Sequence, residues 1–202
     1  MTVKEAVEKR RSIRKFTGTP VTRDQLIDLI EVARLCPSSI NSQPWRFRPV
    51  TDPATIAWFS GEATSKQTWL AGAGGVIVCC VDAGAYMRDS RAILHAMRDA
   101  GMITTEFSDQ VDTLYLDPIA SGPPAMLRAA AAFNLAIAMS AMTLRAVEMG
   151  LGTTWVGRVE EDMVKQKLAL PAHLAVIALL AVGWPAEQPD QRPRKGLDEI
   201  LV

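Results

Sequence analysis

The sequence predicts a single globular domain, residues 1–202, in which helices pack around buried strands. Of its 202 residues, 49% are hydrophobic, and a chain of this length can bury a sizeable core. Two near-continuous apolar runs, at residues 75–81 and 174–182, are typical of strands buried on both faces. The longest helical pattern, residues 126–149, has too many apolar positions for a helix with one wet face. These three observations indicate a fold that combines α and β elements.

The N-terminal elements are predicted from side chains that cap the starts of helices and from prolines that end them. Residues 2–10 predict a short amphipathic helix. Thr22 and Gln25 form a capping box, which begins a helix that ends near Cys36 because Pro37 disfavours helical angles in the residue before it. The sequence then predicts a strand at residues 45–50, a helix beginning at Asp52-Pro53 and a short helix at residues 66–71.

The later elements are predicted in the same way, with one weak region. Residues 83–122 predict a helix near positions 88–98 followed by a loop or lid. Gly150 is a left-handed cap for the long helix, which we expect at the centre of a core or of a dimer interface. Acidic residues 160–162 begin the next helix, where their negative charges interact favourably with the positive end of the helix dipole.

Composition limits the class of protein. The 22 basic and 22 acidic residues cancel, which argues against a nucleic-acid binder, since such proteins need a basic face. Three cysteines without a C-x-x-C motif favour a reducing compartment, the cytoplasm, and two histidines supply a metal site poorly. No signal peptide is expected before the first helix. The apolar stretch 125–144 carries Arg128 and Asn134, so we expect a buried helix rather than a membrane span.

A basic cluster follows the first helix. Arg10, Arg11, Arg14 and Lys15 surround Ser12. Guanidinium groups bind phosphate through paired, charged hydrogen bonds, and a serine adds a further donor. The alternative is a set of solvated basic residues at a helix end. A second basic run, residues 192–195, is alone most simply a solvated tail or a localisation signal.

A polar loop lies between Pro37 and Pro44. It offers short hydrogen-bonding side chains on a stiffened backbone, from Ser38, Ser39, Asn41, Ser42 and Gln43. An ordinary polar loop is the alternative. Together with the basic cluster, this loop suits a ligand with an anionic end and a heteroaromatic end, which predicts a flavin mononucleotide (FMN) site.

The sequence shows no acid–base machinery. The passage G-L-G-T-T-W-V-G follows a helix and lacks the G-x-G-x-x-G spacing of dinucleotide-binding proteins. It is either a tight turn or a place where backbone approaches a flat ring. Neither histidine has an obvious serine or cysteine partner. A cofactor that carries the chemistry itself would explain this absence.

These motifs, in this order, resemble the FMN-dependent nitroreductase family over residues 4–202. The resemblance is carried by R-R-S-I-R-K-F, P-S-S-I-N-S-Q-P-W-R-F, G-L-G-T-T-W-V-G, A-L-L-A-V-G-W-P and R-P-R-K-G-L-D-E-I. It implies an α+β fold, with a mainly antiparallel central sheet wrapped by helices, in an intertwined homodimer. Two FMN sites would lie at the dimer interface, each built from both subunits.

The resemblance also implies roles for individual residues. Phosphate and ribityl contacts would come from Arg10, Arg11 and Ser12, with Arg192 and Arg194 closing on the phosphate. Arg14 would lie by the pyrimidine edge of the flavin. Backbone beside the reactive ring nitrogen would come from Gly157 and Arg158. The partner subunit would contribute Pro37, Ser38, Ser39 and Asn41.

Two positions depart from the family pattern. Lys66-Gln67 stands where members often have asparagine-glutamine, which either adds charge near the pyrimidine or loses a contact. Arg158 stands where members often have glycine, and it would narrow the pocket or select an acidic substrate. The resemblance therefore predicts FMN binding and leaves the substrate open.

The expected function is an oxidoreductase that uses NADH or NADPH to reduce a small acceptor, such as a nitroaromatic, quinone or flavin, by a ping-pong mechanism. No catalytic side chain is obligatory, because the flavin carries the chemistry. Alternatives within the fold are reductive dehalogenation, oxidation of peptide rings and flavin breakdown. An FMN storage or sensing protein is an alternative of another class, and a nucleic-acid-binding module is a third.

Overall fold

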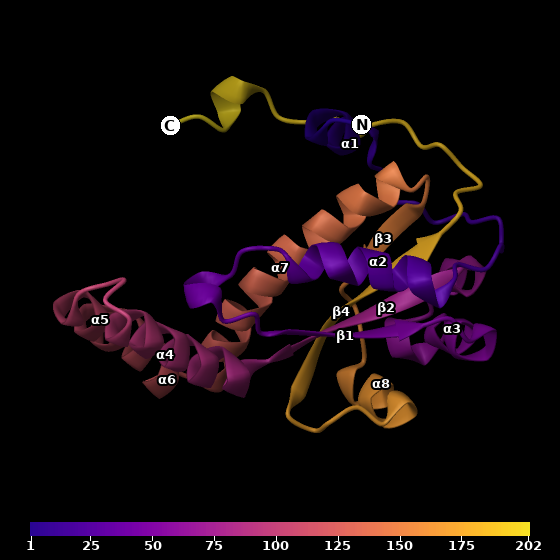
Figure 1. The fold of residues 1–202 in the computed structure, drawn as a ribbon. Helices are drawn as coiled ribbons and strands as arrows, with labels where there is room; N and C mark the ends of the chain where they lie inside the picture. The colour runs from indigo at the N-terminus through magenta and orange to yellow at the C-terminus, as the bar shows by residue number, and fades with distance from the viewer.

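Four strands form one antiparallel sheet in the order β1-β2-β4-β3 in the computed structural model of residues 1–202 (Figure 1). The two apolar runs are its central strands, as predicted. Together with the surrounding helices this sheet confirms the α+β class and its antiparallel character. The strands are β1 Trp45–Val50, β2 Gly75–Asp82, β3 Gly152–Val156 and β4 Leu174–Gly183.

The sheet is covered on both faces, which explains the continuous apolar run of β2. Alternate side chains of a strand point to opposite faces. Ile77, Cys79 and Val81 pack in one core cluster with α2 (Arg23–Arg34) and α7 (Pro124–Glu148). The residues between them pack in a second cluster with α3 (Pro53–Phe59) and α8 (Glu161–Leu168). Figure 1 shows these two helix pairs on opposite sides of the sheet.

The predicted capping features are present, but one short helix was predicted with the wrong type and the wrong start. The first helix, α1, is Val3–Lys9, and Thr22 and Gln25 form the reciprocal capping box that begins α2. Asp52 caps α3 as expected. The helix predicted at residues 66–71 is instead a 3₁₀ turn, Thr68–Gly72. Ser65 and Lys66 have left-handed φ angles of 54° and 60°, which prevent a helix from starting there.

Residues 83–122 are more helical than the sequence predicted. The helix expected near positions 88–98 is α4, Ala83–Asp99, which begins earlier because the Asp82 side chain caps its first turn. The prediction of an irregular loop after this helix is wrong. In its place the chain forms α5 (Thr105–Val111), a π-helical turn (Asp112–Leu116) and α6 (Asp117–Ser121). With α4, these elements project from one end of the sheet (Figure 1).

The long helix α7 is a core helix of this fold. By length and composition it is apolar enough to cross a membrane. In the structure it packs against α2 and the sheet, and an Arg145–Asp28 ion pair of 2.7 Å joins it to α2. Gly150 follows it with a φ of 75°, the predicted left-handed cap.

Glu161 joins three elements, and its removal should cost stability. Its carboxylate accepts hydrogen bonds from Arg128 (2.6 Å) and from the backbone amide of Val176 (3.0 Å). Burial opposes ionisation, but these hydrogen bonds and the nearby positive charges outweigh it and lower the pKa of Glu161. Glu161→Gln should therefore lower the free energy of unfolding by about 2 kcal/mol at pH 7 in urea denaturation.

The pH dependence of that loss follows from the lowered pKa. The stabilisation is present above the pKa of an unfolded glutamate and is lost as pH falls through the lower folded value. The variant and the wild type should therefore converge in acid. Asp162→Asn, at an exposed neighbour, is the matched control and should lose only its interaction with the helix dipole, about 0.5 kcal/mol. Equal stabilities of wild type and Glu161→Gln at pH 7 would contradict this account.

Candidate functional site

The segment after α1 runs along the edge strand β3. Ser12 pairs with Thr153 in a parallel bridge, and the Ile13 amide donates to the Thr153 carbonyl at 3.0 Å. The Thr154 hydroxyl donates to the Ile13 carbonyl. A Cβ on Gly152 would lie 2.6 Å from the Ile13 side chain, so this approach requires glycine. The basic cluster is thereby fixed beside β3.

The two basic runs meet in one polar cavity of about 230 Å³. Nine residues line it, none of them hydrophobic, and they come from both ends of the sequence. The structure therefore brings together the predicted residues of the first run with Arg192 and Arg194. This basic pocket is lined by Arg10, Arg11, Ser12, Arg14, Glu187, Pro189, Asp190, Arg192 and Arg194.

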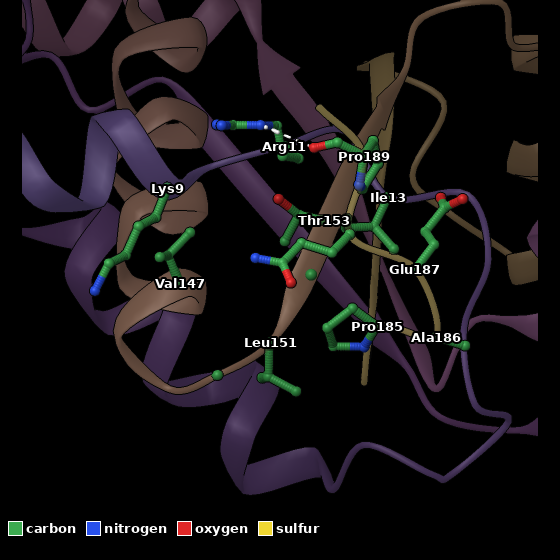
Figure 2. A pocket seen from close by; sticks show the side chains of 13 residues that line it. Lys9, Arg11, Ile13, Val147, Leu151, Thr153, Pro185, Ala186, Glu187 and Pro189 are labelled. Carbon is green, nitrogen blue, oxygen red and sulfur yellow. Dashed lines mark hydrogen bonds between the residues drawn. The ribbon is translucent and has the colours of Figure 1, made fainter. Parts of the chain in front are cut away.

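Arg10 and Arg11 are neighbours in the basic pocket but make different contacts. The Arg11 guanidinium donates to the carbonyls of Glu8 (2.6 Å), Arg10 (2.9 Å) and Pro189 (3.2 Å). It therefore ties the C-terminal segment to the end of α1, and Figure 2 shows the bond to Pro189. The Arg10 guanidinium makes no hydrogen bond or ion pair within the chain, so it is available to an anionic ligand.

Glu187 was not predicted from the sequence. Its carboxylate accepts hydrogen bonds from the backbone amides of Arg14 (2.6 Å) and Lys15 (3.0 Å). It thereby fixes the backbone that carries Arg14. The Arg14 guanidinium lies 6.0 Å from the centre of the Trp69 ring, in cation–π range.

A second hollow of about 290 Å³ shares Arg10 and Ser12 with the basic pocket. Its walls come from α7 and β3 and are rich in hydroxyl groups, which sequence reasoning missed. On α7 the contributing positions are three apart and so share a face. This hydroxyl cleft is lined by Arg10, Ser12, Ser140, Thr143, Thr153, Thr154 and Trp155.

The largest cavity, about 480 Å³, lies on the other side of the N-terminal segment. Successive residues of an extended segment face opposite sides. Arg10 and Ser12 line the hydroxyl cleft, whereas Arg11 and Ile13 line this cavity, together with Leu151 (Figure 2). Of the predicted site residues, only Arg11 reaches it.

The predicted polar loop lies elsewhere in the same chain. Ser39–Asn41 form a 3₁₀ turn that packs against α4, and the Ser39 amide donates to Asn134 on α7 at 2.7 Å. Asn134 precedes Thr143 by nine positions, so about 13 Å of helix separates this contact from the hydroxyl cleft. Within one chain the structure does not bring Pro37, Ser38, Ser39 and Asn41 to the basic pocket. Their role in the site of a partner subunit stays a prediction.

The two departures from the family pattern, Arg158 and Lys66-Gln67, are both outside the basic pocket. Gly157 and Arg158 directly follow β3, and both are exposed beyond the strand that walls the hydroxyl cleft. Lys66 forms a 3.1 Å ion pair with Glu62, and both side chains are largely exposed. Lys66 does not line the basic pocket.

Comparison with known proteins gives one consistent family. The family model described as "Nitroreductase family" matches residues 7–184. An NADH dehydrogenase of Thermus thermophilus is 31% identical over 199 residues, covering 98% of this chain and 94% of its own. A 5,6-dimethylbenzimidazole synthase of Rhodospirillum rubrum is 29% identical (89% and 80% covered), and an FMN reductase [NAD(P)H] of Bacillus subtilis is 27% identical (94% and 68% covered).

The fold also has close structural counterparts. A protein of Exiguobacterium sibiricum, solved in complex with FMN, superposes with a TM-score of 0.77 at 23% identity. The match covers 100% of this chain and 97% of that one. The four-stranded sheet and its helical layers are therefore a known fold.

Proposed function

This chain belongs to the nitroreductase family, and from that premise we propose that it is a cytoplasmic, FMN-dependent NAD(P)H oxidoreductase that reduces a small oxidised acceptor. The observation that carries the proposal is the basic pocket, where arginines from both ends of the chain converge, and its junction with the hydroxyl cleft. Nitroaromatics, quinones and flavins are the proposed acceptors.

The residues present fit FMN in three ways. The basic pocket has the charge that a phosphate group needs, with Arg10 unpaired and Arg192 and Arg194 beside it. The hydroxyl cleft offers serine and threonine side chains to a polyol chain. Beyond the cleft, exposed Gly157 lets backbone approach a flat ring, because no Cβ stands in the way.

The residues of the chain bind and orient, and bound FMN would supply the transfer of reducing equivalents from NAD(P)H to the acceptor. No carboxylate, histidine or cysteine lines the hydroxyl cleft, so the chain offers no acid or base there. Arg14 would favour negative charge at the edge of the ring. The nicotinamide and the acceptor would occupy one site in turn, which gives ping-pong kinetics.

A homodimer completes this proposal. α7 exposes a face of small and apolar side chains at helical spacing, Ala129, Phe133, Ala136 and Ser140, and Phe133 is 68% exposed. Ser140 also lines the hydroxyl cleft. A second copy packed on this face would therefore cover the apolar side chains and close the cleft, and its polar loop would add Pro37, Ser38, Ser39 and Asn41.

Steady-state kinetics test the proposed function. Initial rates of NADH and NADPH oxidation would be measured without oxygen at several concentrations of a quinone, a nitrofuran and free FMN. Parallel double-reciprocal lines are expected for at least one acceptor. Intersecting lines would contradict the ping-pong mechanism, and no oxidation with any acceptor would favour FMN storage or sensing.

Arg158 is the expected determinant of acceptor preference. Its side chain is exposed immediately after Gly157, on the segment that would border the flavin ring. Arg158→Gly should lower kcat/KM for a carboxylated nitroaromatic by about tenfold relative to an uncharged analogue, since a charged hydrogen bond would be lost. FMN affinity should be nearly unchanged. Loss of FMN in this variant would instead make Arg158 a cofactor-binding residue.

A second candidate comes from the relative named 5,6-dimethylbenzimidazole synthase. Chromatographic detection of 5,6-dimethylbenzimidazole after incubation of the purified protein with FMN and NAD(P)H would favour that activity. Its absence, together with turnover of a quinone or nitroaromatic, would favour the reductase.

A further inference from the structure

The polar loop has a strained backbone. Ile40, Asn41 and Gln43 have φ angles of 51°, 53° and 43°, all in the left-handed region. This region is uncommon for any residue except glycine, and a β-branched residue such as Ile40 is a clear outlier there. Such strain persists only where surrounding contacts hold the backbone, and it concentrates at functional sites.

One of the contacts that hold the loop comes from α7. Asn134 is 1% exposed, on a helix whose other buried residues are mostly apolar. Its side-chain oxygen accepts the Ser39 amide hydrogen at 2.7 Å, and its side-chain nitrogen donates to the Ala130 carbonyl at 2.9 Å. Both the oxygen and the nitrogen of this buried amide group are therefore hydrogen-bonded, and the bond to the oxygen holds the loop.

The other contact comes from α4. Tyr86 is fully buried on α4, which packs against the 3₁₀ turn of the loop, and its phenol makes a 3.1 Å hydrogen bond with the hydroxyl of Tyr115. The Ser39 side chain interacts with the same phenol. Burial, followed by the interaction with Tyr115, raises the pKa of Tyr86, so the phenol stays protonated. Ser39 is thus hydrogen-bonded through its backbone to α7, and its side chain lies beside the Tyr86 phenol of α4.

We propose that Asn134 and Tyr86 are positioning residues for FMN binding, because Asn134 holds the Ser39 backbone, Tyr86 packs beside the Ser39 side chain, and together they keep the strained loop in the shape that contacts the cofactor. The inference rests on the proposed function, in which this loop completes the site of a second copy. It also assigns a role to residues 83–122, whose first helix supports the loop. Apparent affinity falls in proportion to the fraction of molecules with a competent loop.

Two variants separate this role from general stability. Tyr86→Phe removes one hydroxyl and keeps the ring, and Asn134→Leu replaces the amide with an apolar group of similar size. Val164→Ala is the control, because Val164 is buried in α8 on the opposite face of the sheet. It should lower the melting temperature without touching Ser39.

The measurements are FMN titration of the apo-protein and hydrogen exchange of a peptide spanning residues 37–43. Both loop variants should bind FMN about tenfold more weakly, and their loop amides should exchange about tenfold faster. The Val164→Ala affinity should stay within about twofold of wild type. Kinetics at saturating FMN should show a smaller change than the affinity.

The outcomes are distinguishable. A wild-type protein that does not bind FMN would overturn the proposed function, and this inference with it. A wild type that binds FMN, with Tyr86→Phe and Asn134→Leu matching its affinity and loop exchange, would overturn the inference alone. Affinity losses in Val164→Ala as large as in the loop variants would show a general effect of stability and would also overturn it.

Discussion

Arg10→Ala is expected to weaken FMN binding by about ten- to a hundredfold while the protein stays folded. The reason is that the Arg10 guanidinium lines both the basic pocket and the hydroxyl cleft, yet has no partner within the chain. A charged hydrogen bond to phosphate is worth about 1.5–3 kcal/mol, and alanine removes it. Fluorescence titration of the apo-protein with FMN measures the change.

Variants of two further arginines show whether the loss of FMN affinity is specific to Arg10. Arg48→Ala, on β1 and outside the basic pocket, should bind FMN as the wild type does. Arg11→Ala should lose the three carbonyl contacts that tie the C-terminal segment to α1, so it should lower the melting temperature as well. If Arg10→Ala keeps the wild-type affinity, the basic pocket does not hold the phosphate.

Arg14→Ala should make bound FMN harder to reduce. A positive charge about 4 Å from developing negative charge contributes a few kcal/mol at an effective dielectric constant of about 20, and solvent at this exposed side chain reduces that value. A fall of about 30 mV in the two-electron midpoint potential corresponds to about 1.4 kcal/mol and is the expected size. Spectroscopic redox titration measures it.

The neighbouring lysine is the control for that change. Lys15 is exposed and does not line the basic pocket, so Lys15→Ala should leave the midpoint potential unchanged. Arg14→Lys keeps the charge and should recover most of the potential. An Arg14→Ala protein with the wild-type potential would remove Arg14 from this role.

Local signals in the sequence were enough for most of the fold. Capping at Thr22 and Asp52, the left-handed Gly150 and the apolar runs of β2 and β4 each depend on residues close together in the chain. The helices of residues 83–122 were partly missed, because their caps, such as Thr104, are single side chains in a polar stretch. The antiparallel arrangement of the sheet came from the resemblance rather than from the pattern.

The candidate site depends on contacts between residues that are far apart in the sequence. Local sequence patterns do not reveal such contacts. The bridge between Ser12 and Thr153 places the arginine cluster beside β3, where Arg10 and Arg11 share the basic pocket but only Arg10 reaches the hydroxyl cleft and only Arg11 the 480 Å³ cavity. Glu187 and Asn134 act through backbone amides far away in the sequence, so neither showed a recognisable motif. The basic cluster itself was visible because its members are adjacent.

The most direct test of the central claim is a visible spectrum of the purified protein, repeated after NADPH or NADH is added without oxygen. Flavin bands at about 370 and 450 nm that bleach with at least one nicotinamide are expected. A colourless protein that cannot be reconstituted with FMN would contradict the FMN site. Bands that persist with both nicotinamides would contradict the reductase activity while leaving FMN binding in place.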